Sequence, residues 1–529
     1  MRTRHVPATH RRILCVSPRY APSFGIFQYS YPFFGRRVRA FMPPQGLLVV
    51  ANYLPESWEV RFVDENARPA EAVDFQWADA VFVSGMHVQR FAINDLVARA
   101  HAADKPVALG GPSVSGCPEF YPDADLLHIG ELGDATDRVI QWIDTHPGRP
   151  RYPLRFETAQ RLSLVDFPTP AYHLVPLRQY FIANIQFSSG CPYSCEFCDI
   201  PALYGRNPRL KAVAQVLAEL DEIAASGATS VYFVDDNFIG NQKAALELLP
   251  HLVDWQQRNR YPLRFACEAT LNIAKNERVL GLMREAGFVT VFCGIETPEP
   301  QALRFMSKDQ NLRMPILEAV GRINAYGMEV VSGIILGLDT DTSQTADHII
   351  AFVRASQIPV LTINILYALP KTPLWRRLEA EGRLLRESDR ESNVVFTLPH
   401  ETVISMWLRC ITAAYEPEAI YGRFAHNIVH TFAQRLAFPR NAQRESWGNM
   451  RMGLALLGRV IWRVGIRGNY RRTFWRFAGP ALRRGRIEEV IHVAVVSHHL
   501  IEFTRQCVQG AREPSFYAPA APPRAVAAG

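Results

Sequence analysis

Between residue 12 and about residue 130, short apolar runs alternate with segments that have the length and periodicity of helices. The apolar runs include RRILCVSP, WEVRFVDEN, ADAVFVSGM, KPVALGGPS and LLHIGE, whereas INDLVARAHAA has a helical pattern. Strands that are separated by helix-length connections form parallel sheets with crossover helices. The pattern therefore predicts an open, doubly wound α/β domain, whose ligands would lie at the carboxyl ends of the strands.

A second series of the same kind begins at residue 182 and continues to about residue 390. Its strands are expected near IANIQFS, TSVYFVDD, LRFACEAT, VTVFCGIE, EVVSGIIL and LTINILYAL. Helical segments such as KAVAQVLAELDEIAASGA and ERVLGLMREAGF lie between them. Six repeats of strand and helix predict a partial or complete parallel barrel of the (β/α)6 type, with its chemistry in the loops that follow the strands.

Outside these two units the pattern changes. A Pro-rich, weakly periodic stretch between about 147 and 176 predicts a linker. Beyond about residue 390 the sequence predicts helices rich in Arg and aromatic residues, and the Pro/Ala-rich end, EPSFYAPAAPPRAVAAG, is typical of a disordered tail. We therefore expect five parts: a doubly wound domain at 1–150, a linker at 151–180, a barrel at 181–390, a mainly helical domain at 391–515 and a tail at 516–529.

The composition is that of a folded protein with several domains. The chain has 529 residues, of which 48% are hydrophobic and 21% charged, and this excludes a disordered, collagen-like or coiled-coil protein. Nine cysteines are too few for a disulfide scaffold and indicate a reducing compartment. The N-terminus has no secretory cleavage site, and no uninterrupted apolar stretch of about 18 residues occurs. We expect a cytoplasmic protein without a transmembrane helix.

The net charge of +7 is concentrated in one segment. Residues 446–487 contain ten arginines and no Asp, Glu or Lys, so subtracting this +10 from +7 leaves −3 for the rest of the chain. Three arginines recur every four residues, an apolar row lies opposite them and aromatic residues are nearby, as on an amphipathic helix. These residues are Arg459, Arg463 and Arg467, then Leu454, Leu457, Ile461 and Val464, and finally Trp462, Trp475 and Phe477.

The sequence leaves two interpretations of this basic segment open. Basic residues next to Trp suit an anionic lipid surface, which would make the protein peripheral on the inner face of the membrane. The alternative is a solvated helix face, or one docked on the acidic remainder of the chain; Gly458, Gly465 and Gly468 also weaken the helix. No recognisable RNA-binding module accompanies the arginines, so no nucleic acid partner is expected.

Cys191, Cys195 and Cys198 form a C-x3-C-x2-C motif directly after the first barrel strand. Three thiolates on one short loop can face a common centre, and soft sulfur ligands select iron-sulfur clusters or zinc. A structural zinc site needs four closed ligands, and no fourth Cys or His follows at the usual spacing. A four-iron cluster held by three thiolates instead leaves one iron open to a substrate or cofactor.

This spacing, after the first strand of a β/α barrel, resembles that of the radical S-adenosylmethionine (SAM) superfamily, and the resemblance covers about 182–390. The alternative is a chance spacing of buried thiols. The resemblance implies a [4Fe-4S] cluster whose open iron chelates SAM, and an external electron donor. One electron then cleaves SAM to a 5′-deoxyadenosyl radical, which can remove hydrogen from an unactivated carbon.

The resemblance also implies SAM-binding residues at the ends of the barrel strands. Phe197, within the last C-x2-C, would lie near adenine, and Asp235 and Asp236 would meet the SAM amino group. Glu268 and Thr270 end the third strand, and Glu296 ends the fourth, where a carboxylate could hold ribose hydroxyls. The last three positions are Gly333, Leu336 and Gly337, which would let backbone approach adenine. Each residue alone could instead cap the helix that follows it.

A doubly wound domain in front of such a barrel resembles the cobalamin-dependent, or class B, radical SAM methylases. The resemblance implies that the loops after three strands bind cobalamin, although glycines at strand ends also make ordinary tight turns. The residues are Ser84, Gly85, Met86, Gly110, Gly111, Pro112, Ser113, Gly130 and Glu131. The D-x-H-x-x-G motif that supplies a cobalt-ligating histidine is absent, and His87, His101 and His128 lack its context. The lower axial ligand of cobalt is therefore left open.

Within this class, the chain looks most like the hopanoid C-2 methylase group, in runs such as SGMHVQR, EATLNIA, FCGIETPEP and IEEVIHVAVVSHHLIEF. The resemblance implies two uses of SAM, one to methylate cobalamin and one to form the radical, and a hydrophobic polycyclic lipid as substrate. Alternatives are a methylase of a tetrapyrrole, such as a bacteriochlorophyll side chain, and a methylthiolating RNA enzyme. The latter would carry a second cysteine trio, which Cys15 and Cys117 do not form. A non-catalytic metal-binding adaptor is the alternative from a different class.

Overall fold

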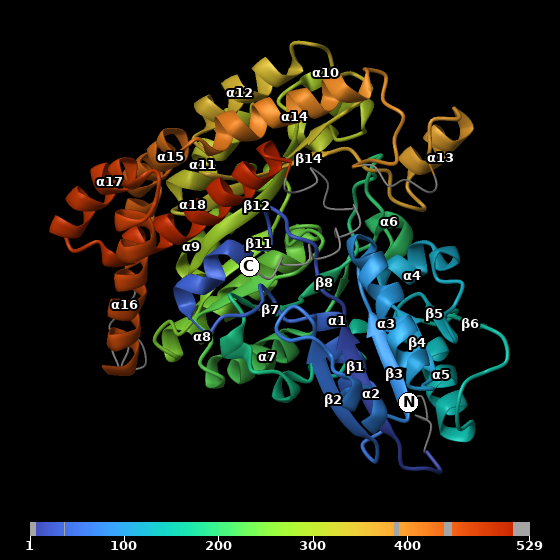
Figure 1. Cartoon of the computed structure of the whole chain (residues 1–529). Helices are drawn as coiled ribbons and strands as arrows, with labels where there is room; N and C mark the ends of the chain where they lie inside the picture. Colours follow the sequence, from blue (N-terminus) through green and yellow to red (C-terminus); the bar gives the residue numbers. More distant parts are fainter. Residues whose placement is uncertain (1–6, 36, 386–390, 438–446, 511–529) are drawn as a thin grey trace, which may run out of the picture.

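Two parallel sheets and a helical C-terminal region make up the computed structural model (Figure 1). It describes residues 7–510 except 36, 386–390 and 438–446, and it leaves the side chains of 448 and 449 undescribed. The tail predicted at 516–529 lies outside the described residues. The predicted fold class is confirmed: a doubly wound domain, a parallel half-barrel and a mainly helical domain follow one another along the chain.

The first sheet has six parallel strands in the order β2-β1-β3-β4-β5-β6. The strands are β1 Arg12–Ser17, β2 Glu59–Asp64, β3 Ala80–Ser84, β4 Val107–Gly110, β5 Leu126–Ile129 and β6 Leu154–Glu157. The helices between them are α1 Gln45–Tyr53, α2 Ala72–Trp77, α3 Arg90–Ala102, α4 Pro112–Gly116 and α5 Asp134–Thr145. The strand order reverses between β1 and β3, and ligands of open α/β sheets bind at such a point.

The segment at 151–180 is not only a linker. Its residues Leu154–Glu157 form β6, which pairs with β5 at the edge of the first sheet. Pro150 and Pro153, just before it, hid this strand from sequence analysis, although the strand itself contains no proline. The remainder of the segment forms three short 3-10 helices that lead to the barrel, at Leu164–Asp166, Tyr172–Leu174 and Leu177–Gln179.

The second sheet has six parallel strands in the order β14-β13-β12-β11-β10-β7, and it confirms all six predicted barrel strands. They are β7 Ala183–Ile185, β10 Ser230–Phe233, β11 Arg264–Glu268, β12 Phe288–Glu296, β13 Glu329–Leu336 and β14 Val360–Ile365. The helices are α6 Ile200–Leu203, α7 Val213–Ala225, α8 Gln242–Arg258, α9 Glu277–Ala286, α10 Pro300–Phe305, α11 Ile316–Ala325, α12 Thr345–Ser356 and α13 Pro373–Ala380. No pairing joins β7 to β14 in the described residues, so the barrel is partial.

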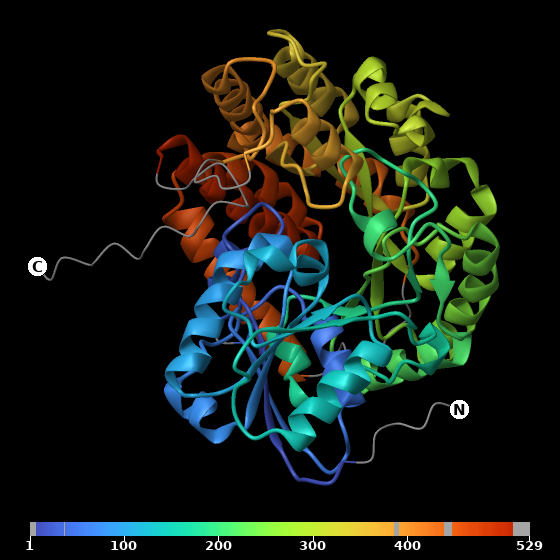
Figure 2. The same cartoon turned by 90° about the vertical axis from the view of Figure 1, so that its right-hand side faces the viewer.

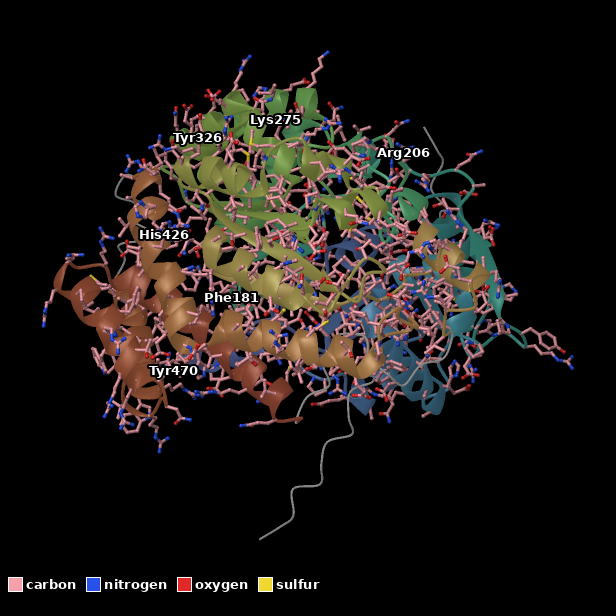
Figure 3. All side chains as sticks on the ribbon, turned by 90° about the horizontal axis from the view of Figure 1, so that it is seen from above. Phe181, Arg206, Lys275, Tyr326, His426 and Tyr470 are labelled. Atoms are coloured by element: carbon pink, nitrogen blue, oxygen red, sulfur yellow. The ribbon has the colours of Figure 1, made fainter. Side chains whose placement is uncertain are left out.

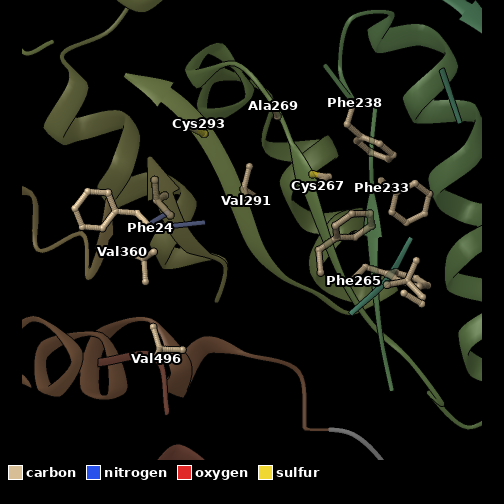
Figure 4. Close-up of a cluster of buried hydrophobic side chains, with 14 of the residues drawn as sticks. Phe24, Phe233, Phe238, Phe265, Cys267, Ala269, Val291, Cys293, Val360 and Val496 are labelled. Carbon is tan, nitrogen blue, oxygen red and sulfur yellow. The ribbon is translucent and has the colours of Figure 1, made fainter. Parts of the chain in front are cut away.

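The two faces of the barrel sheet differ in burial. Outward-facing side chains such as Phe233, Phe265 and Cys267 are fully buried against helices (Figure 4). Most inward-facing residues on the same strands are partly or fully exposed, among them Tyr232 and Glu268, although Ala266 is buried. Since successive side chains of a strand point to opposite faces, the alternation means that the interior is open rather than packed solid.

The unpaired edges of the half-barrel are covered by segments from both ends of the chain. On one side, the Phe181 and Ile182 N–H groups, just before β7, donate to the carbonyls of Ala40 and Phe41. On the other side, α14 (His400–Tyr415) packs along β14. Helix α18 (Ile487–Val508) lies between these covers and contacts both α14 and the 3-10 helix at Gln28–Phe34, as Figure 2 shows in red and blue.

The C-terminal domain contains α14, α15 (Pro417–His430), α16 (Trp447–Val460), a π-helical turn (Ile461–Ile466), α17 (Arg471–Arg483) and α18. Seen from above, Tyr470 of this domain and Arg206 of the cysteine loop lie on opposite sides of the molecule (Figure 3).

The amphipathic pattern predicted for residues 446–487, with arginines on one face of a helix and an apolar row on the other, is wrong in detail. Leu454, expected on the apolar face, is exposed, whereas Arg459 donates to the Phe33 carbonyl at 3.0 Å. Both residues lie in the regular part of α16, before the π-turn, so the docking of this helix against the 3-10 helix at Gln28–Phe34, and not a change of helix type, decides which side is exposed.

Candidate functional site: a cysteine loop between two parallel sheets

The three motif cysteines lie on a loop that a short antiparallel ladder closes at its base. This ladder consists of β8 (Ser188–Ser189) and β9 (Arg209–Leu210), and the Cys191 N–H donates to the Gly205 carbonyl at 3.2 Å. Gly190 precedes Cys191 with φ +101°, and a side chain there would lie 2.9 Å from the Gly205 carbonyl. Glycine is therefore required for the chain to turn into the loop.

The thiols have the environment of an iron-sulfur ligand set. The Gln310 amide donates to the Cys195 sulfur at 3.3 Å, and burial raises the pKa of the Cys191 and Cys198 thiols, so thiolates there need a metal to compensate them. Across the described residues, no three Cys, His, Asp or Glu side chains converge closely enough to chelate one metal ion.

Asp235 and Asp236 follow β10 and bind the backbone of the cysteine loop. The carboxylate of Asp235 accepts hydrogen bonds from the Phe187 N–H and from the N–H and hydroxyl of Ser188. That of Asp236 accepts one from the Gly190 N–H at 2.7 Å. Burial raises the pKa of Asp235 to about 7 and that of Asp236 to about 6. The resemblance placed both at the SAM amino group; here they also fix the loop that carries the cysteines.

The inner face of the barrel offers polar groups at the carboxyl ends of its strands. Glu268 is exposed to this interior and accepts a hydrogen bond from the Tyr232 hydroxyl at 3.4 Å, while burial of the surrounding site raises the pKa of Glu268 to about 7. Asn364 of β14 is exposed on the same face. Thr270 donates to Asn272, whose amide donates to the Tyr193 hydroxyl at 3.0 Å. This ring of polar groups suits a ligand with hydroxyl and amino groups.

Glu296, at the end of β12, forms a buried ion pair with Lys308. Its backbone is in the left-handed region with φ +66°, an unusual conformation for a residue with a side chain. The Lys308 ammonium also lies over the Phe197 ring, 5.3 Å from its centroid. The structure thus brings together Phe197 and Glu296, which are about a hundred residues apart, through a lysine that sequence analysis did not select.

Contacts within the protein constrain the three positions predicted at the fifth barrel strand, β13. Gly337 has φ +90°, donates its N–H to Asp341 at 2.7 Å, and would place a side chain 2.6 Å from the Phe396 ring. Leu336 is fully buried, and its carbonyl accepts from the Leu366 N–H, so its side chain and carbonyl both face protein. Only Gly333 faces the interior, where a side chain would lie 3.5 Å from the Glu296 carboxylate.

The loops of the first domain that were expected to bind cobalamin converge at the carboxyl edge of its sheet. Gly111 has φ +92°, and a side chain there would lie 2.5 Å from the Ser84 hydroxyl and 3.1 Å from the Gly85 N–H. The Gly130 N–H donates to the Ser115 hydroxyl at 2.9 Å. Three consecutive strands, β3, β4 and β5, therefore present their loops side by side as a backbone-lined surface.

Side chains on these loops have different surroundings. Met86 is half exposed, and Pro112 begins α4, directly after Gly110 and Gly111. The Ser113 hydroxyl is buried against that of Tyr121. Glu131 accepts from two arginines, Arg161 and Arg209, the latter from the base of the cysteine loop.

The three histidines near these loops have structural surroundings. His101 bonds to Asp125 and His128 to Thr136, both at 2.9 Å. Burial lowers the pKa of His87 to about 3, and its ring lies near those of Phe120 and Tyr367. These surroundings do not single out one of the three as a ligand of cobalt.

Sequence analysis missed several residues of the site, notably Gln310, Lys308 and Arg209. Lys308 lies in a loop, Gln310 in a short 3-10 helix and Arg209 in the two-residue strand β9, and each acts on a partner that is at least twelve residues away. None of the three carries a signal within a single sequence, because β9, at Arg209–Leu210, is too short to show the alternation of a strand.

Comparison with known proteins agrees with this architecture. The chain matches the B12 binding domain over 33–140, the radical SAM superfamily over 185–353 and a domain of unknown function (DUF4070) over 372–513. It is 58% identical over 510 residues to the hopanoid C-2 methylase of Rhodopseudomonas palustris, covering 96% of each chain. Two solved structures share the fold: the cobalamin-dependent SAM radical enzyme OxsB, with TM-score 0.58, and the methyltransferase TsrM of Kitasatospora setae, with TM-score 0.52.

The two structures differ from this chain in sequence more than in shape. OxsB is 14% identical and the match covers 94% of this chain and 80% of that one; TsrM is 17% identical, with 72% and 80% covered. OxsB was solved with aqua-cobalamin and SAM, and TsrM with cobalamin and a [4Fe-4S] cluster. Those three groups are the cofactors of the present enzyme, in agreement with its cysteine loop and its two parallel sheets. The chain belongs to the cobalamin-dependent radical SAM methylases, in the group of the hopanoid C-2 methylase.

Proposed function

We propose that the enzyme transfers a methyl group from SAM, by way of methylcobalamin, to C-2 of a hopanoid. The observation that carries this proposal is the 58% identity to a hopanoid C-2 methylase along 96% of both chains. The match spans the loops after the strands, which is where substrates of such folds bind. A hydrophobic polycyclic lipid is therefore the proposed substrate class.

In this proposal the protein positions its cofactors and excludes water. The bound cluster and SAM would supply hydrogen abstraction, and cobalamin the methyl group. Cys191, Cys195 and Cys198 would hold the cluster, and Glu296 and Glu268 would hold hydroxyl or amino groups of SAM in the open barrel interior. The loops after β3, β4 and β5 would hold cobalamin. Neither general acid nor general base is needed from the chain, because hydrogen leaves the substrate as an atom.

Lipid analysis of a gene deletion tests the substrate. Deleting the coding sequence in its host should abolish hopanoids methylated at C-2 and leave the unmethylated ones, as measured by lipid mass spectrometry. The wild-type gene should restore them and a Cys195→Ala variant should not. Cys117→Ala is the matched control, since this half-buried thiol lies outside the cysteine loop and should restore methylation.

Other outcomes would point to the alternatives. Unchanged C-2 methylated hopanoids would refute the substrate assignment, and a missing methyl group on a tetrapyrrole would favour a tetrapyrrole methylase. Purified under anaerobic conditions, the protein should contain iron and sulfide, and its visible absorbance should be lost in Cys195→Ala. Stoichiometric zinc instead would favour the non-catalytic adaptor.

The proposal includes contact with a membrane surface through residues 446–487. Supporting it is an exposed apolar row at helical spacing along α16 and the π-turn, of which the sequence pattern had singled out only Leu454 and Trp462. The row consists of Trp447, Met450, Leu454, Trp462 and Ile466, with exposed fractions of 73%, 51%, 60%, 53% and 51%. Exposed arginines at 451, 463 and 467 lie one residue further along the helix and flank this row. An apolar row with basic neighbours suits the surface of an anionic bilayer.

Figure 1 shows α16 extending from the body of the molecule, where a flat surface could reach it. No helix among the described residues is long and apolar enough to cross a membrane. The proposed association is therefore peripheral. A polycyclic hydrocarbon dissolves in a bilayer rather than in water, so an enzyme at the bilayer surface would meet its substrate there.

Vesicle binding tests the membrane contact. The protein should co-sediment with vesicles that contain anionic phosphatidylglycerol and bind much less to neutral phosphatidylcholine vesicles, and added salt should weaken the binding. Replacing three exposed apolar residues in the row, Trp447→Ser, Leu454→Ser and Trp462→Ser, should reduce binding. The matched control changes three apolar residues that are exposed elsewhere, Val73→Ser, Val165→Ser and Val429→Ser. Equal binding by both triple variants would argue against this surface.

A further inference from the structure

Glu131 lies at the carboxyl end of β5, in the first domain, and contacts the base of the cysteine loop in the second. Its two carboxylate oxygens lie 2.6 and 2.8 Å from one terminal nitrogen of Arg209, and one of them lies 2.8 Å from Arg161. The Glu131 side chain is only 11% exposed. A carboxylate that accepts from two guanidinium groups in this way has little capacity left for another ligand.

Both arginines also bind the cysteine loop. Arg209 donates to the Ser189 hydroxyl at 3.1 Å, two residues before Cys191. Arg161 donates to the carbonyls of Leu203 and Tyr204, at 3.0 and 3.2 Å, in the second half of the loop. Glu131 is therefore the centre of a bridge that holds the start and the end of the cysteine loop against the first domain.

A second contact joins the same loops of the first domain to the opposite edge of the barrel. Lys371, after β14, donates to the Ser115 carbonyl, and the Ser115 hydroxyl accepts from the Gly130 N–H, next to Glu131. Arg209 belongs to the β7 side of the half-barrel and Lys371 to the β14 side. The loops expected to bind cobalamin are thus fastened at both edges of the barrel that binds SAM.

We propose that Glu131 is a positioning residue, which acts through Arg209 to hold the cysteine loop at a fixed distance from the cobalamin loops, rather than a cobalamin contact. A reaction that uses groups on two domains depends on their separation, and a displacement of about 1 Å can cost on the order of a hundredfold in rate. Outer contacts of metal ligands typically change metal affinity by about 10- to 100-fold when removed.

The experiment compares Glu131→Gln, Arg209→Gln and the double variant, each reconstituted with iron, sulfide and hydroxocobalamin. Three quantities are measured: cobalamin retained after gel filtration, the electron paramagnetic resonance spectrum of the reduced cluster with and without SAM, and the rate of iron loss to a chelator. Glu119→Gln is the matched control, because it removes an exposed ion pair with Arg155 from the same domain.

Glu131→Gln should keep its cobalamin, show an altered cluster spectrum and lose iron on the order of tenfold faster than wild type. Arg209→Gln should do the same, and the double variant should be no worse than Arg209→Gln alone, because one interaction is removed in each case. Retained cobalamin shows that the first domain is folded, and Arg209→Gln leaves that domain unchanged.

Two results would overturn the proposal. Loss of cobalamin from Glu131→Gln with an unchanged cluster would make Glu131 a cobalamin contact. Wild-type behaviour of both single variants would show that the bridge does not hold the cysteine loop in place. The three measurements need only the bound cofactors and no lipid. A wrong substrate assignment would therefore leave them unaffected, and the two failures can be told apart.

Discussion

Asp235 is fully buried at the end of β10, and it illustrates how the neighbours of a residue decide its role. A carboxylate at the carboxyl end of a barrel strand can bind a ligand or cap nearby backbone groups. Asp235 accepts from Phe187 and Ser188, directly before the cysteine loop, so its first role is to hold that segment. Ser188 donates both its backbone N–H and its hydroxyl, and the hydroxyl bond explains a serine at this position.

Replacing Asp235 by Asn should destabilise the loop, because the amide nitrogen cannot accept a hydrogen bond. We expect a loss of about 1–3 kcal/mol in the free energy of unfolding of the cofactor-free protein, measured with urea, and a lower iron content after reconstitution. Asp254→Asn, on the exposed side of α8, is the matched control and should change neither quantity. Normal stability and iron content in Asp235→Asn would show that the loop does not need these bonds.

At the scale of elements, the open barrel must satisfy the backbone groups of its two edge strands. Helix α14 does this for β14 with side chains: the Tyr415 hydroxyl accepts from the Leu361 N–H at 3.1 Å and donates to the Leu361 carbonyl, and the Trp407 ring donates to the Ile363 carbonyl at 2.8 Å. An edge without such a cover would be a site of aggregation. The C-terminal domain is therefore part of the barrel rather than an appendage.

Removing the Tyr415 hydroxyl should leave a buried N–H and a buried carbonyl of β14 unpartnered. We expect Tyr415→Phe to lower the free energy of unfolding by about 1–3 kcal/mol and to speed amide hydrogen exchange in 360–365. Tyr152→Phe is the control, since Tyr152 is 66% exposed. If both variants match wild type, the hydroxyl of Tyr415 is not what closes the edge.

At the scale of the whole molecule, the two ends of the chain pack on each other. The segment after β1 docks on α18: the Ser30 hydroxyl donates to the Val495 carbonyl at 2.8 Å, and the His499 ring bonds to the Ser23 and Phe24 carbonyls at 3.0 and 3.2 Å. The Phe24 ring also lies 5.3 Å from that of Tyr415, on the helix that covers β14. First domain, barrel and C-terminal domain therefore share one hydrophobic cluster, beside a second one confined to the first domain, so the N-terminal segment and α18 should open together.

His499→Leu should test this coupling, because leucine fills the space without donating to the two carbonyls. Hydrogen exchange should become faster both in α18 and in residues 23–34, which precede His499 by more than 460 positions. The free energy of unfolding should fall by about 1–3 kcal/mol. His251→Leu, on the exposed face of α8, should change neither. Faster exchange in α18 alone would mean that the N-terminal segment is held by other contacts.

The predictions from sequence succeeded where the signal was local. All six barrel strands and the β/α order of the first domain could be read from alternating apolar runs, and the cysteine motif from its spacing. β6 was missed because the prolines before it resembled a linker, and Leu454 was assigned to the wrong face because a single sequence does not show which side of α16 packs against the rest of the molecule. Site residues proposed for SAM and cobalamin stay predictions, although the structure gathers most of them at facing strand ends.

By itself, then, the sequence determined the class of each domain, the order of the strands along the chain and the loop that carries the cysteines, because these depend on residues that are neighbours in the chain. Only the tertiary structure decided which side chains serve that loop. The pairs Glu131–Arg209, Asp235–Ser188 and Lys308–Glu296, and the cover of β14 by α14, all join residues from different elements. The pattern of residues along the chain does not specify how far apart such residues lie in space, because only the packing of the elements sets that distance.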